Sequence, residues 1–392
     1  MTSRSTTVDP LDFLSVESTL SDEERDIRDA VRAFVRSRVL AEVGDWFEQG
    51  RVPRELVGEL GKLGVLGMHL EGYGCAGTSA TAYGLACLEL EAGDSGLRSL
   101  VSVQGSLAMF AIHRWGSQEQ KQEWLPRLAA GEAVGCFGLT EPDSGSDPGS
   151  MRTHARRDGD DWVLRGRKMW ITNGTWADVA VVWARTDMGI RGFLVPKGTP
   201  GFAAQEISKK LSLRASVTAE LILDDVRLPA SALLPGATSL RGPLSCLNEA
   251  RFGILWGAAG AARACLAAAI DYSTTRTQFG KPIGAFQIQQ HKLAHMAVEV
   301  NRATLLALHL GRLKDAGQLR PEQVSMGKLA NVNSALDVAR TARQVLGANG
   351  ISLEYPVIRH MVNLESVVTY EGTADVHALV VGAALTGIDA FR

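Results

Sequence analysis

A carboxylate near the C-terminus is the strongest candidate for chemistry in this sequence. Glu371 lies in the stretch Thr369-Tyr370-Glu371-Gly372-Thr373, after an apolar segment over 357–364 and before a predicted helix. Thr373 is a favourable N-cap, and Gly372 lets backbone or ligand approach closely. A carboxylate on such a turn would be partly desolvated, which raises its pKa and makes it a better base. A solvated glutamate before a helix is the alternative, and taken alone these residues favour it.

Three further segments carry groups that could bind an oxygen-rich or planar ligand. The loop over 140–148 offers hydroxyl and backbone N–H donors, although its composition is also that of an ordinary surface turn. Trp170 lies near Thr172 in a predicted strand, where it could stack on a planar ring or pack in the core. The segment 276–280 sets an arginine and an amide beside an aromatic ring. It suits a pyrophosphate with an adjoining ring, or equally a helix end with a favourable arginine.

Weaker signals come from an arginine and a glycine-capped helix end. Arg98 precedes a strongly apolar helix, and a guanidinium that points into a helix-lined cavity needs an anion partner. The stretch 344–350 has the pattern of a helix end with a glycine cap. His291 and His295 stand at i and i+4 without the HExxH pattern, so a solvated or core pair is expected. No metal-ligand spacing, P-loop or GxSxG elbow is present.

Composition limits the classes of protein that this chain can belong to. Its 392 residues exceed the usual size of a single core, so two or three domains are expected. The net charge of −2 argues against nucleic acid or an anionic membrane as partner. The five cysteines include no CxxC pair, which favours reduced thiols and no structural zinc. The most apolar window, 252–270, is interrupted by Arg263 and indicates a buried helix. The segment 1–10 lacks the apolar centre of a secretory signal, so a cytoplasmic protein is expected.

Periodicity divides the chain into helical, β and helical parts, with domains expected over 1–130, 131–236 and 237–392. Ser21 and Glu24 form a predicted capping box at an early helix. Between 134 and 228 short runs alternate with period two and are separated by turn residues, which predicts a small antiparallel sandwich or barrel. Long amphipathic helices are predicted over 244–273, 285–315 and 322–346 and would form an antiparallel bundle.

These segments together resemble the acyl-CoA dehydrogenase family, and most closely its glutaryl-CoA branch. The likeness covers about residues 20–391 and is most distinctive over 72–77, 136–142, 271–280, 349–352 and 369–373. Five matches in order over one chain are a specific signal. The resemblance implies an α+β protein with an N-terminal helical domain, a middle β domain, a C-terminal four-helix bundle and FAD as cofactor.

The resemblance also assigns the catalytic and cofactor-binding residues. Glu371 would be the base that removes the α-proton of an acyl thioester. Residues expected against the flavin are Phe137, Leu139, Thr140, Ser146, Trp170, Ile171, Thr172, Thr373 and Asp375. A second set would hold the adenine nucleotide part of FAD, partly across a subunit interface: Arg276, Gln278, Phe279, Gln287, Gln344, Leu346 and Gly347. A homo-oligomer follows, expected to be a tetramer.

Substrate contacts are implied in the same way. Residues expected at the thioester and CoA are Ser146, Leu244, Asn248, Arg251, Tyr370 and Gly372. Members of the glutaryl branch bind a second carboxylate at the far end of the acyl chain, and Arg98, Ser99 and Glu91 match that position. Leu97 stands where that branch often has tyrosine, and Ala374 where it usually has histidine. The first difference reshapes the acyl pocket, and the second removes a polar group beside the base.

These assignments predict oxidative decarboxylation of glutaryl-CoA to crotonyl-CoA, with hydride transfer to flavin N5 and an electron-transfer flavoprotein as acceptor. An alternative is dehydrogenation of another short dicarboxylic or branched acyl thioester, on CoA or on a carrier protein, without decarboxylation. A hypothesis of a different class is a flavin-free interaction protein that has lost catalysis. The presence of Glu371, Arg276 and Trp170 argues against that last hypothesis.

Overall fold

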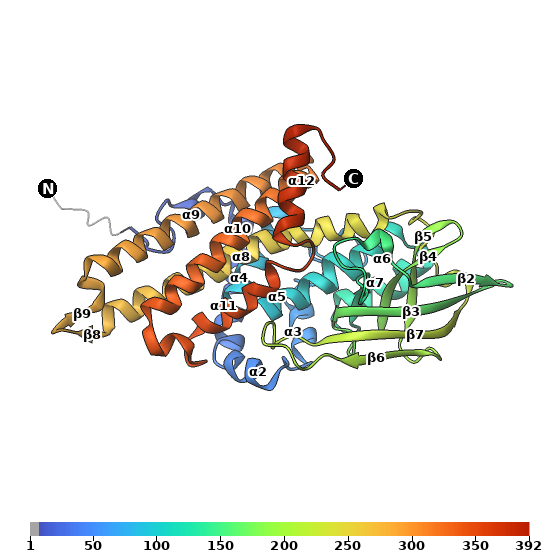
Figure 1. The fold of residues 1–392 in the computed structure, drawn as a ribbon, viewed down its shortest axis with the longest axis horizontal. Coiled ribbons are helices and arrows are strands. Elements are labelled where there is room, and N and C mark those ends of the chain that lie inside the picture. The colour runs from blue at the N-terminus through green and yellow to red at the C-terminus, as the bar shows by residue number, and fades with distance from the viewer. Residues whose placement is uncertain (1–7, 392) are drawn as a thin grey trace.

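The computed structural model describes residues 8–391 and shows an elongated molecule (Figure 1). Long helices fill most of it, and a sheet lies at one end of the long axis. Along the chain the order is helices, then strands, then helices. This order and the mixed content agree with the predicted α+β class.

The N-terminal part is helical, and its most buried helices lie in the middle of this part. Ser21 caps α1 in the predicted capping box, with Glu24 bonding back to the Ser21 N–H. The helix α4 and the segment α5–η3 are buried on nearly all sides because their residues are small or apolar. The elements of this part are η1 (Val16–Thr19), α1 (Asp22–Phe34), η2 (Val35–Val39), α2 (Val43–Gln49), α3 (Leu56–Lys62), α4 (Ala80–Gly93), α5 (Ser95–Ser102), η3 (Val103–Met109), α6 (Phe110–Trp115) and α7 (Gln118–Ala129).

The middle part forms a seven-stranded sheet in the order β1-β4-β2-β3-β7-β6, with β5 paired to β4. Its strands are β1 (Gly135–Gly138), β2 (His154–Asp158), β3 (Asp161–Thr172), β4 (Val179–Thr186), β5 (Gly189–Pro196), β6 (Phe202–Glu206) and β7 (Thr218–Leu228). Most neighbours pair antiparallel as predicted, but β4 pairs in parallel with β1 and with β2. The sheet is therefore mixed, because the β2–β3 hairpin separates β1 from β4 along the chain and lets both strands run in the same direction.

The alternation along β4 confirms that both faces of this strand are covered. Val179, Val181 and Trp183 lie in a core that also contains residues of η3 and α7. Ala180, Val182 and Ala184 lie in a second core made of strand residues such as Trp162 and Leu221. A side-chain period of two sends successive residues to opposite faces, so this pattern could be interpreted from the sequence alone.

The C-terminal part is a bundle of long helices. Its helices are α8 (Arg241–Thr275), α9 (Gln287–Asp315), α10 (Pro321–Val345), α11 (Pro356–Val367) and α12 (Ala374–Thr386), with the small hairpin β8 (Thr277–Gln278) and β9 (Lys281–Pro282) between α8 and α9. The short 3-10 segments of the chain after the first helices are η4 (Pro148–Ser150), η5 (Ala230–Ala232), η6 (Ile283–Ala285) and η7 (Gly347–Ile351). The three helices predicted from periodicity correspond to α8, α9 and α10, with ends shifted by only a few residues.

The helix α8 is the centre of this bundle and packs against α4, α9 and α10. By length and composition alone it could cross a membrane, but 72% of its most apolar window is buried inside the protein. A core helix passes the same test. The burial of α8 therefore supports the prediction of a buried helix in this segment.

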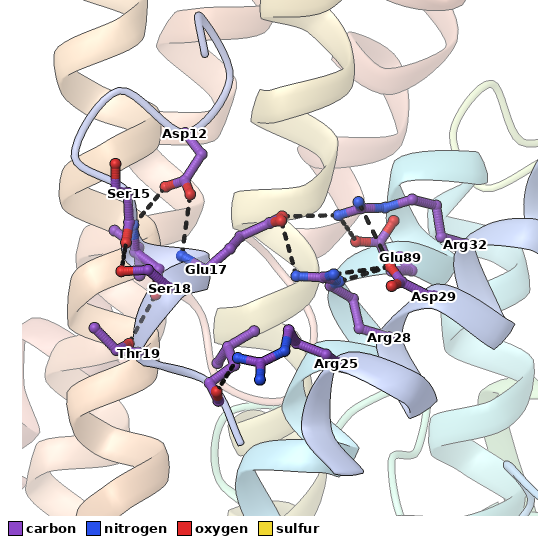
Figure 2. A network of polar contacts seen from close by, with 12 residues as sticks. Asp12, Ser15, Glu17, Ser18, Thr19, Arg25, Arg28, Asp29, Arg32 and Glu89 are labelled. Carbon is purple, nitrogen blue, oxygen red and sulfur yellow. Dashed lines mark hydrogen bonds and ion pairs between the residues drawn. The ribbon is translucent and has the colours of Figure 1, made fainter. Parts of the chain in front are cut away.

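Hydrogen bonds between charged side chains join the segment before α1 to α1, and join α1 to α4 and α4 to α8 (Figure 2). Glu17 accepts hydrogen bonds from Arg28 Nη1 at 2.8 Å and Arg32 Nη2 at 2.9 Å. Arg32 also bonds the buried carboxylate of Glu89 at 2.9 Å, and Arg263 bonds the same carboxylate at 2.6 Å. Burial raises the pKa of Glu89, but Arg263 and Arg32 outweigh it and hold that pKa below its usual value. These bonds link α1, α4 and α8, which come from distant parts of the chain.

Candidate active site

Glu371 lies in a tight turn between α11 and α12. Its φ angle is 53° and that of Gly372 is 97°, so two successive residues have the left-handed conformation. Thr373 caps α12 as predicted and accepts a hydrogen bond from the Val376 N–H at 3.2 Å. A left-handed non-glycine residue costs on the order of 1 kcal/mol or more, and it persists only where its surroundings hold it. The contacts around the turn therefore decide where the Glu371 carboxylate points.

Two cations hold the backbone of this turn through its carbonyl groups. The Lys328 Nζ on α10 donates to the Tyr370 carbonyl at 2.5 Å and to the Gly372 carbonyl at 2.7 Å. Arg251 Nε on α8 donates to the Glu371 carbonyl at 2.7 Å, and its Nη1 donates to Asn248 Oδ1 at 3.1 Å. Three successive carbonyls therefore accept hydrogen bonds from positively charged groups.

The Glu371 side chain is half-buried, and its Oε2 is buried without a hydrogen-bond partner among residues 8–391. Burial raises the pKa of Glu371, while Arg98, Lys328 and Arg251 oppose the rise. The pKa remains above its usual value, which is the state of a carboxylate that accepts a proton readily at neutral pH. Burial also lowers the pKa of Lys328 to about 7, although Glu371 favours its charged form. The turn thus presents an unpaired base inside a cluster of cations.

The predicted distal-carboxylate residues lie beside this turn and contact each other. Arg98 Nε donates to Glu91 Oε2 at 2.6 Å, and both side chains are buried. Arg98 Nη2 donates to the Tyr370 hydroxyl, and Ser99 Oγ lies 3.3 Å from the same oxygen. The anion partner that Arg98 requires is therefore Glu91, whose Oε1 has no hydrogen-bond partner among residues 8–391. Burial, opposed by Arg98, raises the pKa of Tyr370 to about 12, so its hydroxyl stays neutral.

A histidine that the sequence analysis did not single out covers the other side of the turn. His377 on α12 is buried, and neither ring nitrogen has a hydrogen-bond partner within the described residues. Burial, together with Lys328 and Arg251, lowers the pKa of His377 to about 3, so the ring is neutral. A Cβ atom on Gly372 would stand 2.9 Å from His377 Nε2, and the φ of Gly372 is also left-handed. Glycine is needed at this position for both reasons.

The substrate residues predicted on α8 share one face of that helix. Leu244, Asn248 and Arg251 are spaced by about one helical turn, and each is partly exposed. Arg251 connects this face directly to the Glu371 turn. Ser146, by contrast, is exposed in the loop after β1, and no contact joins it to Glu371. Its predicted role depends on a bound ligand that reaches both places.

The predicted flavin-facing residues gather where β1 and β3 approach each other. Phe137 and Leu139 are buried, and the Thr140 carbonyl accepts a hydrogen bond from the Met169 N–H at 2.8 Å. The pairing of β3 with β7 shifts register between Lys168 and Ile171. Within this irregularity Trp170 has a φ of 63° and 59% of its surface is exposed. Ile171 is buried and Thr172 is half-buried.

The exposed ring of Trp170 bears on whether these residues fit FAD. An aromatic side chain that is turned out of a strand at an irregular position presents a flat face to a planar ring. Lys168 fixes the neighbouring loop, since its buried Nζ donates to the Leu139 carbonyl at 3.0 Å and to Glu141 Oε1 at 2.8 Å. These residues fit the isoalloxazine end of FAD.

The residues predicted to hold the adenine nucleotide lie far from Trp170. The β8–β9 hairpin and the sheet stand at opposite ends of the long axis (Figure 1). Arg276 is the exposed C-cap of α8, and Phe279 in the hairpin is 94% exposed with a φ of 52°. The other members of this set follow at the start of α9 and the end of α10: Gln287, Gln344, Leu346 and Gly347. One chain therefore does not bring the two predicted halves of the FAD site together.

Lys328 is the functional candidate that the sequence analysis missed, although a signal for it was present. Val324, Lys328, Asn331 and Ala335 recur at helical spacing, and all four are buried on α10. A lysine on an apolar stripe is unusual, because a buried ammonium requires compensating hydrogen bonds. Its partners are distant in the sequence, so the stripe alone could not identify them.

Comparison with known families and structures agrees with this geometry. Three sequence profiles match in order: the N-terminal domain of acyl-CoA dehydrogenase over residues 21–132, the middle domain over 136–226 and the C-terminal domain over 241–386. The chain is 37% identical to the short-chain specific acyl-CoA dehydrogenase of Bos taurus mitochondria, over 95% of this chain and 92% of that protein.

Two crystal structures of glutaryl-CoA dehydrogenase from Mycobacterium smegmatis are more similar. One is 66% identical with a TM-score of 0.96 and covers 97% of this chain and 99% of the other. The second, in complex with FADH2, is 63% identical with a TM-score of 0.97, and the match covers 98% of this chain and 100% of the other.

Proposed function

The chain belongs to the acyl-CoA dehydrogenase family, and on this basis we propose that it catalyses the FAD-dependent oxidative decarboxylation of glutaryl-CoA to crotonyl-CoA and CO₂. The observation that carries the choice of substrate is the buried Arg98, which stands with Ser99 next to Tyr370 and the base Glu371. A guanidinium in that position suits an acyl chain that ends in a carboxylate. The mycobacterial structures of the same branch support this choice.

The first step is removal of the α-proton of the thioester by Glu371. Its Oε2 is unpaired and buried, and burial raises its pKa, so it can take a proton from a weak carbon acid. Lys328 and Arg251 hold the turn on which the carboxylate sits. When bound, FAD supplies the hydride acceptor for the hydrogen that leaves Cβ. The flat face of Trp170 and the loop fastened by Lys168 would hold the flavin ring.

The second step uses the far end of the acyl chain. After dehydrogenation the terminal carboxylate is vinylogous to a β-keto acid, so its C–C bond can break with release of CO₂ and the electron pair enters a dienolate. Protonated Glu371 then returns its proton to carbon and gives the crotonyl thioester. Arg98 orients the carboxylate before this step, with the Ser99 and Tyr370 hydroxyls as further hydrogen-bonding groups beside it.

The active protein is proposed to be a homo-oligomer, with a tetramer as the expected form. The sheet, which carries Trp170 on β3, and the β8–β9 hairpin lie at opposite ends of the molecule (Figure 1). This supports the proposal, because a nucleotide held by Arg276 of one chain needs a flavin site from another. The exposed ring of Phe279 would be covered in such an assembly. Electrons are proposed to leave the flavin to an electron-transfer flavoprotein, as the resemblance implies.

Turnover of glutaryl-CoA with an artificial electron acceptor tests the proposed function. The expected result is a yellow protein that releases CO₂ and crotonyl-CoA in equal amounts. Dehydrogenation without CO₂ would favour the alternative reaction on a short dicarboxylic thioester. A preference for butyryl-CoA would favour the short-chain reaction named for the curated relative. A colourless protein without bound flavin would contradict all three.

A further inference from the structure

We propose that Lys328 is the positioning residue for the base: its ammonium group holds the Glu371 turn in the left-handed conformation and keeps the carboxylate ionisable in its buried surroundings. This inference rests on the proposed role of Glu371. The hydrogen bonds from Nζ to the Tyr370 and Gly372 carbonyls, at 2.5 and 2.7 Å, carry it. Lys328 would not touch the reacting atoms and acts through the turn.

The arrangement of the turn explains why one group can hold it. Glu371 and Gly372 are both left-handed, and the carbonyls on either side of Glu371 converge on one Nζ. Each carbonyl is a strong acceptor that must find a partner when buried. If the ammonium group is removed, both carbonyls lose their partner, and the backbone can relax toward the more common right-handed or extended conformations. The carboxylate of Glu371 would then lose its fixed direction.

The stability of the helical bundle does not account for this lysine. Lys328 is 1% exposed, and no carboxylate in the described chain lies within ion-pair distance of its Nζ. Burying an ammonium against neutral carbonyls is costly compared with an apolar side chain of similar size. Methionine at this position would pack in the bundle without that cost. The charge is therefore better explained by the turn that it contacts than by the fold.

Asn331 provides the contrast, because it lies one helical turn further along α10. It is equally buried, and its Nδ2 also donates to two carbonyls, those of Leu255 at 2.9 Å and Ala303 at 3.0 Å. Those carbonyls belong to α8 and α9, so Asn331 links helices and does not contact the turn. Lys328 and Asn331 are equally buried, and each donates to two carbonyls. Lys328 holds the turn, whereas Asn331 links two helices.

Several charged groups face the carboxylate, and each comes from a different element. They are Arg98 from α5, Arg251 from α8 and Lys328 from α10, with Glu91 of α4, Tyr370 of the turn itself and His377 of α12 close to them. His377 stays neutral, and Glu91 is paired with Arg98. The charge of Lys328 lowers the pKa of Glu371 against the effect of burial. Removal of that charge should raise the pKa of Glu371.

Three variants separate the roles of the hydrogen bonds, the charge and the fold. Lys328→Met removes both the donor and the charge, while Lys328→Gln keeps an N–H donor and removes the charge. Asn331→Leu removes two equally buried hydrogen bonds elsewhere on the same helix. Each variant is assayed for amide exchange of the peptide over 369–376, for kcat and KM, and for the pH dependence of kcat/KM.

We expect amide exchange over 369–376 to become at least tenfold faster in Lys328→Met and to change less than threefold in Lys328→Gln and Asn331→Leu. In Lys328→Gln the acid limb of kcat/KM should move to higher pH by about half a unit or more, since the neighbouring positive charge is gone. In Lys328→Met kcat should fall at least tenfold, with a smaller change in KM. Asn331→Leu should lower thermal stability and leave the pH profile in place.

Unchanged exchange over 369–376 in Lys328→Met would overturn the positioning role, and so would an equal change in Asn331→Leu. An unmoved acid limb in Lys328→Gln would overturn the electrostatic role. The wild-type protein is assayed first with glutaryl-CoA and butyryl-CoA. If it turns over neither, the proposed function fails, whereas the amide exchange still decides whether Lys328 holds the turn.

Discussion

Glu91 and Arg98 form a buried ion pair, with 2.6 Å between Glu91 Oε2 and Arg98 Nε. The two residues are seven positions apart, on the adjoining helices α4 and α5, and their side chains are at most 1% exposed. Arg98 reaches the Tyr370 hydroxyl through Nη2, so the pair connects the end of the acyl site to the residue before the base. A substrate carboxylate would join this pair as a third charge, with the Ser99 and Tyr370 hydroxyls beside it.

The first prediction concerns substrate selection by Arg98. Arg98→Ala should lower kcat/KM for glutaryl-CoA by more than tenfold, because truncating one partner of a buried charged contact costs on the order of 2–5 kcal/mol. Butyryl-CoA has no second carboxylate, so its turnover should change little. Both substrates are measured above pH 8, where loss of the Arg98 charge has least effect on ionisation of Glu371.

This variant needs a control, because it leaves Glu91 buried without its partner. Such a residual charge destabilises a protein by about 3–5 kcal/mol. The double variant Arg98→Ala with Glu91→Gln should recover part of that stability and remain poor with glutaryl-CoA. Equal losses for both thioesters would assign Arg98 to the fold and not to the substrate.

The second prediction concerns the base. Glu371→Gln should fold, retain flavin and lose at least about 10²-fold in turnover, because glutamine keeps the shape of the side chain and cannot accept the proton. Absorbance of the bound flavin and steady-state turnover of glutaryl-CoA are measured on the same preparation. Near-normal turnover would exclude Glu371 as the base.

The third prediction concerns stability and pH. Burial lowers the pKa of Lys328 to about 7, whereas an unfolded lysine holds its proton up to its ordinary pKa of 10.5. Between these pH values the unfolded chain binds more protons, so this group makes the free energy of unfolding rise with pH, by up to about 1.4 kcal/mol per pH unit. Lys328→Met removes the contribution. The free energy of unfolding of the variant minus that of the wild-type protein, measured in urea, should therefore be more positive at pH 7 than at pH 9, and parallel curves would contradict the lowered pKa.

The fourth prediction concerns a glycine that leaves space for the ion pair. A Cβ atom on Gly257 of α8 would stand 1.9 Å from Glu91 Oε2 and 3.2 Å from Arg98 Nε. Gly257→Ala should therefore reduce the free energy of unfolding by about 1–3 kcal/mol through overpacking, although alanine is the better helix former. It should also impair turnover of glutaryl-CoA more than that of butyryl-CoA.

Gly382 on α12 is the matched control, since an added Cβ there meets no atom within 4 Å. Gly382→Ala should raise the free energy of unfolding by about 0.5–1 kcal/mol. If both alanine variants gain stability, the Glu91 carboxylate can move away without cost, and the ion pair is not confined by α8.

The fifth prediction concerns assembly. Phe279 is 94% exposed in the β8–β9 hairpin, which stands at the opposite end of the molecule from the sheet that carries Trp170. Sedimentation should therefore show a homo-oligomer. The Arg276→Ala variant should release FAD more readily than the wild-type protein, although its Trp170 is unaltered. Sedimentation of an active, flavin-containing monomer would contradict the division of the FAD site between two chains.

The sequence by itself determined those features that depend on neighbouring residues. Periodicity predicted the helix, strand and helix order and the alternation along β4, because each pattern repeats within one element. Two residues three positions apart predicted the capping box at Ser21. The Glu371 turn could also be identified, since its glycine and its threonine cap are adjacent to it. The roles of the FAD and CoA residues came from the resemblance and stay predictions until they are tested.

Only the tertiary structure decided which distant groups meet. Arg98 and Tyr370 are 272 residues apart, and Lys328 reaches the Tyr370 and Gly372 carbonyls from 42 and 44 residues away. The parallel pairing of β1 with β4 is equally long-range, since two other strands lie between them in the sequence. Local patterns specify which face of an element is buried, but they carry no information on which element covers it. That choice depends on the packing of the whole chain, and it places the cations around Glu371.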